Sequence, residues 1–134
     1  ESTVLDDLDY AVRILSELRE MGIRVAMDDF GTGYSSLNYL RLLPLDTLKI
    51  ERSFVKDVMT GDGSRAVIRS LFRLGRDLGL RTVAEGVETV DQLDFLAESG
   101  CDEVQGFLVA PPLPGPEFRT FLGRFEASQL YAGT

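Results

Sequence analysis

The feature that most constrains this fold is the alternation of short apolar segments with longer amphipathic ones along the chain, without the turn signals of β-hairpins. Strands that alternate with helices are typical of parallel β/α units, which form either an open doubly wound sheet or a closed barrel. A closed barrel needs eight units and typically about 250 residues, whereas this chain has 134 residues and four or five units. The sequence therefore predicts an α/β protein, either about half of a barrel or a small open sheet.

Hydrophobic periodicity and stop residues locate the individual elements. The helix predicted over residues 64–78 ends at Gly79 and has an apolar stripe of Val67, Leu71, Leu74 and Leu78. Strands are predicted over residues 23–27, 45–50, 82–84 and 103–109, and further helices from Asp6 or Asp7 to Met21, over 36–43 and 54–59, from Val90 to the stop at Gly100, and around 118–125.

Polar side chains interrupt the predicted strands at their carboxyl ends. Asp28 and Asp29 follow the first strand, Lys49 lies near the end of the second, Glu85 follows the third, and Gln105 lies within the fourth. A parallel sheet covered on both faces has strands that are apolar nearly throughout. Because β/α folds keep their active sites at the carboxyl ends of the strands, these residues predict a functional site at that edge.

The residue types at this edge favour a hard divalent cation. Carboxylate and amide oxygens suit Mg²⁺ or Mn²⁺ better than zinc or copper. Asp28 and Asp29 cannot both point inward along a regular strand, but where the strand unwinds one can bridge two metals while the other holds one. Lys49 can orient or deprotonate an attacking water, or stabilise developing negative charge. The implied reaction is metal-assisted hydrolysis of a phosphate ester.

Each of these residues also has a purely structural interpretation. Asp28 and Asp29 can cap the glycine-rich turn that follows them, and Glu85 can cap the next turn. Lys49 can extend out of the sheet into solvent, and Gln105 can be a structural amide. Taken one at a time these interpretations are as strong as the functional one or stronger. Four such accidents at one edge of four consecutive strands are a much weaker explanation than a shared site.

The composition excludes several other mechanisms. With no histidine and a single cysteine, Cys101, the chain can form neither a Ser-His-Asp triad, nor a histidine-bearing zinc site, nor an internal disulfide. Its 22 acidic against 14 basic residues argue against binding to a nucleic-acid polymer. No apolar run approaches the roughly 20 residues of a membrane helix. We expect a cytoplasmic location, with any membrane anchor of a parent protein outside this segment.

Four motifs occur in order along the chain: DDFGTGYSSL at 28–37, LKIERSFV at 48–55, VAEGVET at 83–89 and QGF at 105–107. The glycine loop in the first motif lacks the Gly-Lys-Ser/Thr of a Walker loop, so we interpret it as a mobile loop that carries the aspartate pair. Together the four motifs closely resemble the EAL domain, a bacterial phosphodiesterase family that hydrolyses cyclic di-GMP to linear pGpG.

The resemblance implies a TIM-like (β/α) barrel with a two-metal site that uses Mg²⁺ or Mn²⁺. By position in the motifs, Asp28 would bridge both metals, and Asp29 and Glu85 would hold one of them. Lys49 would contact the nucleophilic water, and Gln105 would support the metal–water shell.

The resemblance also implies a regulatory loop that links the metal site to dimerisation. Glu1 matches the second glutamate of the family's Glu-x-Thr-Glu segment and would steady this loop, and Glu88 would belong to the same support. The loop residues are Phe30, Gly31, Thr32, Gly33, Tyr34 and Ser35.

The chain departs from the family pattern in several places. The Glu-Ala-Leu signature, a metal-binding asparagine and the first glutamate of the Glu-x-Thr-Glu segment would lie before Glu1. Residues 1–134 are thus predicted to be the C-terminal part of one EAL domain, inactive alone, from a parent cyclic di-GMP phosphodiesterase. The alternative is a parent that binds cyclic di-GMP as a receptor without cleaving it. Pro111 replaces a common Arg or Lys, and Glu51 replaces the usual aspartate.

Half of a parallel barrel would leave two sheet edges unpaired and apolar faces exposed, and both favour association. We therefore expect a homodimer, or association through the exposed barrel edges. Sensory or GGDEF domains in the parent chain are compatible further partners.

Overall fold

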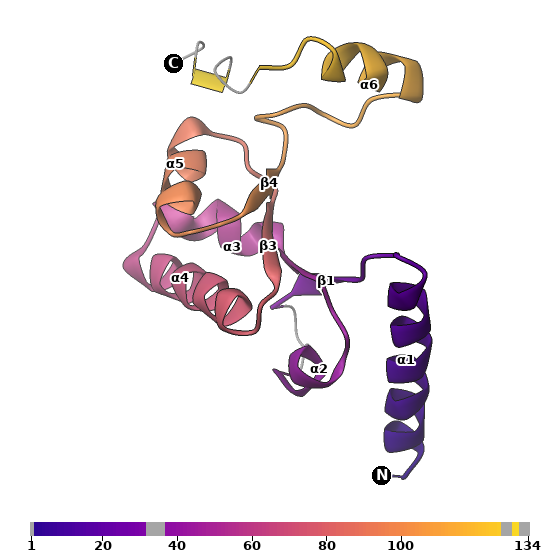
Figure 1. Ribbon diagram of the computed structural model, residues 1–134. Helices are drawn as coiled ribbons and strands as arrows, with labels where there is room; N and C mark the ends of the chain where they lie inside the picture. The colour runs from indigo at the N-terminus through magenta and orange to yellow at the C-terminus, as the bar shows by residue number, and fades with distance from the viewer. Residues whose placement is uncertain (1, 32–36, 127–129, 132–134) are drawn as a thin grey trace.

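A parallel sheet organises the molecule, in a computed structural model that describes residues 2–31, 37–126 and 130–131. Each strand pairs with its neighbour in the sequence, in the order β1-β2-β3-β4 (Figure 1). A doubly wound sheet reverses its strand order at a switch point, and this order has no reversal. The fold is therefore a run of consecutive barrel units. The strands are β1 (Ala26–Phe30), β2 (Thr47–Ile50), β3 (Arg81–Glu85) and β4 (Glu103–Gln105).

The helices alternate with the strands, as predicted. They are α1 (Ser2–Glu20), α2 (Leu37–Leu42), α3 (Arg52–Lys56) with the 3₁₀ turn η1 (Asp57–Met59), α4 (Asp62–Asp77), α5 (Val90–Glu98) and α6 (Gly115–Leu122). Figure 1 shows α3, α4 and α5 gathered on one side of the sheet, with α1 and α6 lying apart from this layer. Among the described residues, no helix has the length and apolar character to cross a membrane.

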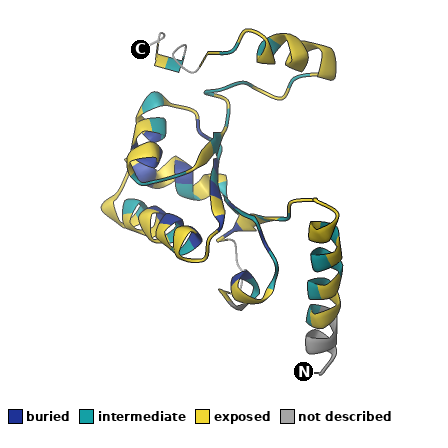
Figure 2. Ribbon diagram, in the orientation of Figure 1, coloured by how far each residue is buried: buried dark blue, intermediate teal, exposed yellow. Residues whose placement is uncertain are grey.

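The hydrophobic core lies between the sheet and the helices α3, α4 and α5. Alternate residues of the central strands are buried on this side, namely Leu48 and Ile50 in β2 and Thr82 and Ala84 in β3. Figure 2 shows the buried positions concentrated in this region, whereas the described parts of α1 and α6 carry none. Burial of apolar side chains on this one side is the main stabilising contribution to the fold.

The opposite face of the sheet is polar in large part. In the parallel register Lys49 lies beside Val83, Val83 beside Glu103, and Glu85 beside Gln105, so these side chains share one face. The expectation of an exposed apolar sheet face is therefore wrong. The large exposed apolar side chains lie on helices and loops instead, and include Tyr10, Met21, Ile23, Phe107, Phe118 and Leu122.

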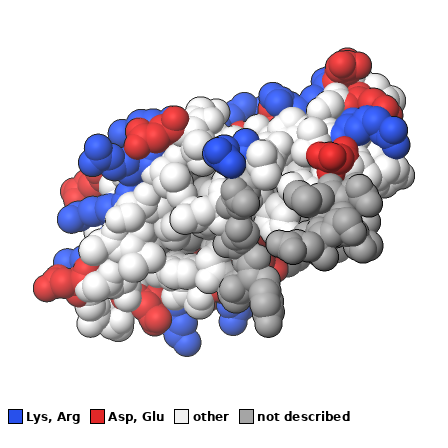
Figure 3. All heavy atoms as spheres, turned by 90° about the horizontal axis from the view of Figure 1, so that it is seen from below, with Lys and Arg blue, Asp and Glu red and all other residues white. Residues whose placement is uncertain are grey.

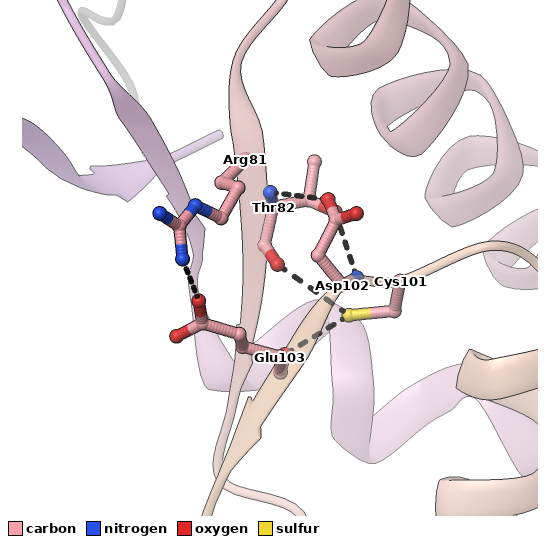
Figure 4. A network of polar contacts seen from close by, with 5 residues as sticks. All are labelled: Arg81, Thr82, Cys101, Asp102 and Glu103. Carbon is pink, nitrogen blue, oxygen red and sulfur yellow. Dashed lines mark hydrogen bonds and ion pairs between the residues drawn. The ribbon is translucent and has the colours of Figure 1, made fainter.

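At the amino ends of the strands, aspartates join neighbouring strands. The Asp102 carboxylate accepts hydrogen bonds from the Thr82 backbone N–H and hydroxyl, both at 2.8 Å (Figure 4). Beside it Arg81 pairs with Glu103 at 2.8 Å. Asp46, just before β2, repeats the device by accepting from the Val25 N–H at 2.8 Å. Charge-assisted hydrogen bonds of this kind fix the start of each strand relative to its neighbour.

The apolar stripe predicted for α4 was correct in its middle, where Leu71 and Leu74 pack against the core, and wrong at its ends. The buried residues of this helix are Ile68, Phe72 and Gly75, whereas Val67 and Leu78 of the predicted stripe are exposed. Gly75 is buried because α4 passes close to β3 there, so that a Cβ on this residue would collide with Thr82.

Several predicted boundaries were also wrong. The first helix begins at Ser2, before the predicted cap, and the first strand begins at Ala26 and includes the aspartate pair. The fourth strand ends at Gln105 instead of residue 109. Its continuation is a turn because Val87 donates to the Gln105 carbonyl and accepts from Leu108 N, at 3.1 and 3.0 Å.

Candidate metal centre

The end of β1 is irregular where it carries the two aspartates. The pairing register with β2 shifts between Met27 and Phe30, and Asp29 has a φ of 52°, in the left-handed region that non-glycine residues seldom adopt. Asp28 Oδ1 accepts a hydrogen bond from the Asp29 N–H at 3.0 Å. The predicted departure from a regular strand is thus confirmed, and it lets adjacent carboxylates approach the same point.

Three of the predicted residues converge at this end of the sheet. One carboxylate oxygen from each of Asp28, Asp29 and Glu85 lies within 4.8 Å of the other two. Asp28 and Asp29 are exposed and Glu85 is half-buried. The set consists only of carboxylate oxygens, which suits Mg²⁺ or Mn²⁺, and its spacing allows the three side chains to share a cation.

Lys49 lies between the carboxylates of its two neighbouring strands. Its Nζ is 3.0 Å from Asp28 Oδ1 and also forms an ion pair with Glu85. These partners, Glu85 first, raise the pKa of Lys49 against the opposing effect of burial. The same contact lowers the pKa of Asp28 below its ordinary value. In this arrangement Lys49 is a cation, suited to orient a water or to stabilise negative charge and not to remove a proton.

Gln105 and Glu88 border the metal centre without joining the carboxylate cluster. Gln105 lies beside Glu85 in the β3–β4 register, and both side chains are part of the lining of a cavity of about 200 Å³. Glu88 lines the same cavity, and its backbone N–H donates to Gln92 Oε1 at 2.8 Å. The structure therefore brings both residues to the predicted edge.

The loop predicted to be regulatory is described only at its start. Phe30 is buried, and Gly31 has a φ of 108° and lies against the Phe54 ring, so that a Cβ there would collide with it. The rest of the predicted loop, and Glu1 of its predicted support, lie outside the described residues. These are Thr32, Gly33, Tyr34, Ser35 and Glu1.

Two residues near the centre were missed by the sequence reasoning. Gln92 is buried and completes a capping box with Thr89, which fixes the turn that carries Glu88; the Thr-x-x-Gln spacing is its sequence signal. Arg52 lines the 200 Å³ cavity, and its place just after the second strand, within the motif at 48–55, is the signal that could have found it.

The surface charge is mixed on one face of the molecule (Figure 3). On the face seen in Figure 3, acidic and basic side chains are intermixed, and the described residues form no extended basic patch there.

Comparison with known proteins gives consistent matches. The profile of the EAL domain matches residues 1–112. Cyclic di-GMP phosphodiesterase NbdA of Pseudomonas aeruginosa is 44% identical over 130 residues, which cover 96% of this chain and 17% of that protein. The bifunctional diguanylate cyclase/cyclic di-GMP phosphodiesterase MucR of the same organism is 45% identical, with 87% of this chain and 17% of MucR covered. The chain thus spans about a sixth of the length of these two relatives.

Solved structures match the fold as well. The EAL domain of Mycobacterium smegmatis DcpA superposes with a TM-score of 0.85 at 44% identity, covering 92% of this chain and 56% of that chain. A manganese/cy-diGMP complex of Klebsiella pneumoniae BlrP1 gives a TM-score of 0.65 at 38% identity, with 71% of this chain and 24% of that chain covered. Both structures are 38% or more identical in sequence to this chain, so the similarity extends beyond the fold.

Proposed function

Because the chain belongs to the EAL domain family, we propose that it supplies one side of a cyclic di-GMP phosphodiesterase site, as the C-terminal part of one EAL domain. The observation that carries this proposal is the convergence of Asp28, Asp29 and Glu85 within 4.8 Å, beside the Lys49 ammonium. The coverage of about half of the DcpA domain supports the view that the chain is part of a larger barrel.

The residues present fit a site for two Mg²⁺ or Mn²⁺ ions, because they offer only oxygen donors at a spacing that cations can share. Asp28 would bridge both ions, and Asp29 and Glu85 would hold one of them. The ions supply an acidified water and neutralise charge on the phosphate when bound. The manganese complex of BlrP1 supports this assignment for a relative.

The chain's own polar residues have separate tasks in the proposed reaction. Lys49 orients the attacking water and stabilises the charge that builds up on the phosphate oxygens. Gln105 holds the hydration shell beside Glu85, its neighbour in the β3–β4 register. Hydrolysis adds one water across one of the two phosphodiester bonds of cyclic di-GMP, breaks one P–O bond and leaves linear pGpG.

Assembly is part of the same proposal. The segment from Phe30 to Ser35, supported by Glu1 and Glu88, would connect the metal centre to a dimer contact. Strands β1 and β4 are edge strands of the described sheet, and their unpaired backbone groups would associate with further barrel units or a second copy. The two activities in the name of MucR support a GGDEF-type partner in a longer chain.

The decisive experiment compares the intact EAL-domain protein that contains this chain with the chain alone. We expect Mn²⁺-dependent conversion of cyclic di-GMP to pGpG by the intact protein and little or none by residues 1–134. Binding without hydrolysis by the intact protein would instead establish the receptor alternative. Absence of both binding and hydrolysis would overturn the proposal.

A further inference from the structure

A cavity of about 200 Å³ adjoins the candidate metal centre and has its own polar lining. It shares Glu85 with the metal centre, so a ligand in the cavity would lie next to any bound cation. The lining contains two carboxylates, and of the described residues that form it, only Arg52 is basic. The full lining is Arg52, Glu85, Gly86, Glu88, Gln105, Gly106 and Phe107.

The backbone at Arg52 is held in a fixed place beside Glu85. Arg52 begins α3, whose first turn is capped by the Glu51 carboxylate accepting from the Ser53 N–H at 2.9 Å. Gly86 follows Glu85 with a φ of 72°, and a Cβ on it would lie 2.5 Å from the Arg52 Cβ. Only glycine satisfies both the conformation and the close approach. The arginine is therefore anchored at its base, at the end of β3.

The head group of Arg52 is available for a ligand. The side chain is exposed, and its guanidinium forms no hydrogen bond or ion pair with any other residue that the structure describes. An unpaired guanidinium beside two carboxylates gives the cavity one positively charged donor group. Its paired N–H donors match the geometry of two phosphate oxygens.

We propose that Arg52 binds the phosphodiester group of the substrate in this cavity, next to the metal centre. This inference rests on the proposed function and deepens it, since it names the residue that offsets the repulsion between an anionic substrate and the Glu85 and Glu88 carboxylates. Arg52 binds substrate and takes no part in holding metal.

The test measures binding of cyclic di-GMP to the intact EAL-domain protein with Mn²⁺ by rapid mixing, within a time too short for a turnover to be completed. In Arg52→Ala we expect the Kd for cyclic di-GMP to rise about 10- to 100-fold, the loss typical of a charge-assisted contact, with a shallower dependence of log Kd on log salt. Arg52→Lys keeps the charge but loses the paired N–H donors of the guanidinium, so its Kd should lie between those of Arg52→Ala and wild type. Mn²⁺ affinity should not fall in either variant.

The matched control is Arg73→Ala, which removes an exposed arginine of α4 that pairs with Asp77 at 3.8 Å, and this variant should bind as wild type does. Equal Kd values and salt slopes for wild type and Arg52→Ala would overturn this inference while leaving the proposed function intact. A wild-type protein that does not bind cyclic di-GMP would instead reject the proposed function itself.

Discussion

Lys49 Nζ lies 3.0 Å from Asp28 Oδ1 on one neighbouring strand and pairs with Glu85 on the other, so a single ammonium joins the ends of β1, β2 and β3. Replacing it by methionine keeps the length of the side chain and removes the charge. We expect turnover of cyclic di-GMP in the intact domain to fall about 100-fold, while Mn²⁺ affinity holds or rises because the ammonium no longer competes for the carboxylates.

Steady-state kinetics and Mn²⁺ titration of Lys49→Met would measure both effects. The control is Lys56→Met at the exposed end of α3, which should change neither quantity. Full activity in Lys49→Met would contradict the assigned role.

The aspartate pair should determine metal affinity. In Asp28→Asn or Asp29→Asn, a neutral amide replaces a carboxylate of the cluster. Mn²⁺ affinity should fall by more than about 10-fold, because mutation of a residue that only hydrogen-bonds to a metal ligand already lowers metal affinity by that factor. Titration calorimetry on each variant would show it. Asp77→Asn on the exposed side of α4 is the matched control and should bind Mn²⁺ as wild type does.

Gly31 should tolerate no side chain. Gly31→Ala places a Cβ at a φ of 108° and against the Phe54 ring, and we expect it to lower the free energy of unfolding by about 1–3 kcal/mol. Chemical denaturation would measure the change. Gly63→Ala, where the space around the Cβ is open, should hold or raise stability. Adding Phe54→Ala to Gly31→Ala should cost less than the sum of the two single changes, because it removes the collision.

Stability should fall in acid through the strand-joining aspartates. Hydrogen bonds from the Thr82 backbone hold the pKa of Asp102 below its ordinary 3.8, so its stabilising contribution is complete above that value. The contribution is lost as pH falls through the lower pKa of the folded state. Asp102→Asn should lower stability at pH 7 by roughly 1 kcal/mol, given partial exposure, and should flatten the loss below pH 4.

Denaturation measured between pH 2 and 7 would show this difference. Asp77→Asn should keep the wild-type profile. An Asp102→Asn curve parallel to wild type in acid would show that the Thr82 contact is not the source of the pH dependence.

The isolated chain should associate in solution. Strands β1 and β4 have a free edge in the described sheet, and several large apolar side chains are exposed on α1 and α6. Size-exclusion chromatography with light scattering should show a dimer or larger species whose population rises with concentration. A compact monomer at every concentration would contradict the prediction.

Much of the fold and the candidate site could be predicted from the sequence. The alternation of periodicities was enough for the parallel α/β sheet, and the polar residues at strand ends were enough to place Asp28, Lys49 and Glu85 together. The sheet-facing side of α4 was predicted only in part, because the stripe was centred on Leu71 and Leu74 and missed the more deeply buried Ile68 and Phe72. Gly75 carries no hydrophobic signal, although its small size is what lets the helix approach β3.

Other features depend on contacts that no local pattern records. The fourth strand ends at Gln105 because the Val87 backbone, distant in sequence, takes up the hydrogen bonds that would have continued it. The left-handed backbone at Asp29 and the position of Arg52 against Gly86 likewise arise from how neighbouring strands meet. The pattern of a single sequence predicts the helices and strands and the polar residues at the strand ends. It does not predict which backbone segments come into close contact.

The central strands direct their apolar side chains to the helices and their charged side chains to the other side of the sheet. The side chains proposed for catalysis and the side chains that stabilise the fold therefore lie on opposite faces of the sheet. Substitutions on the face away from the helices can abolish or change catalysis without disturbing the hydrophobic core. A descendant protein that has lost hydrolysis would therefore keep the same fold and could acquire a different function.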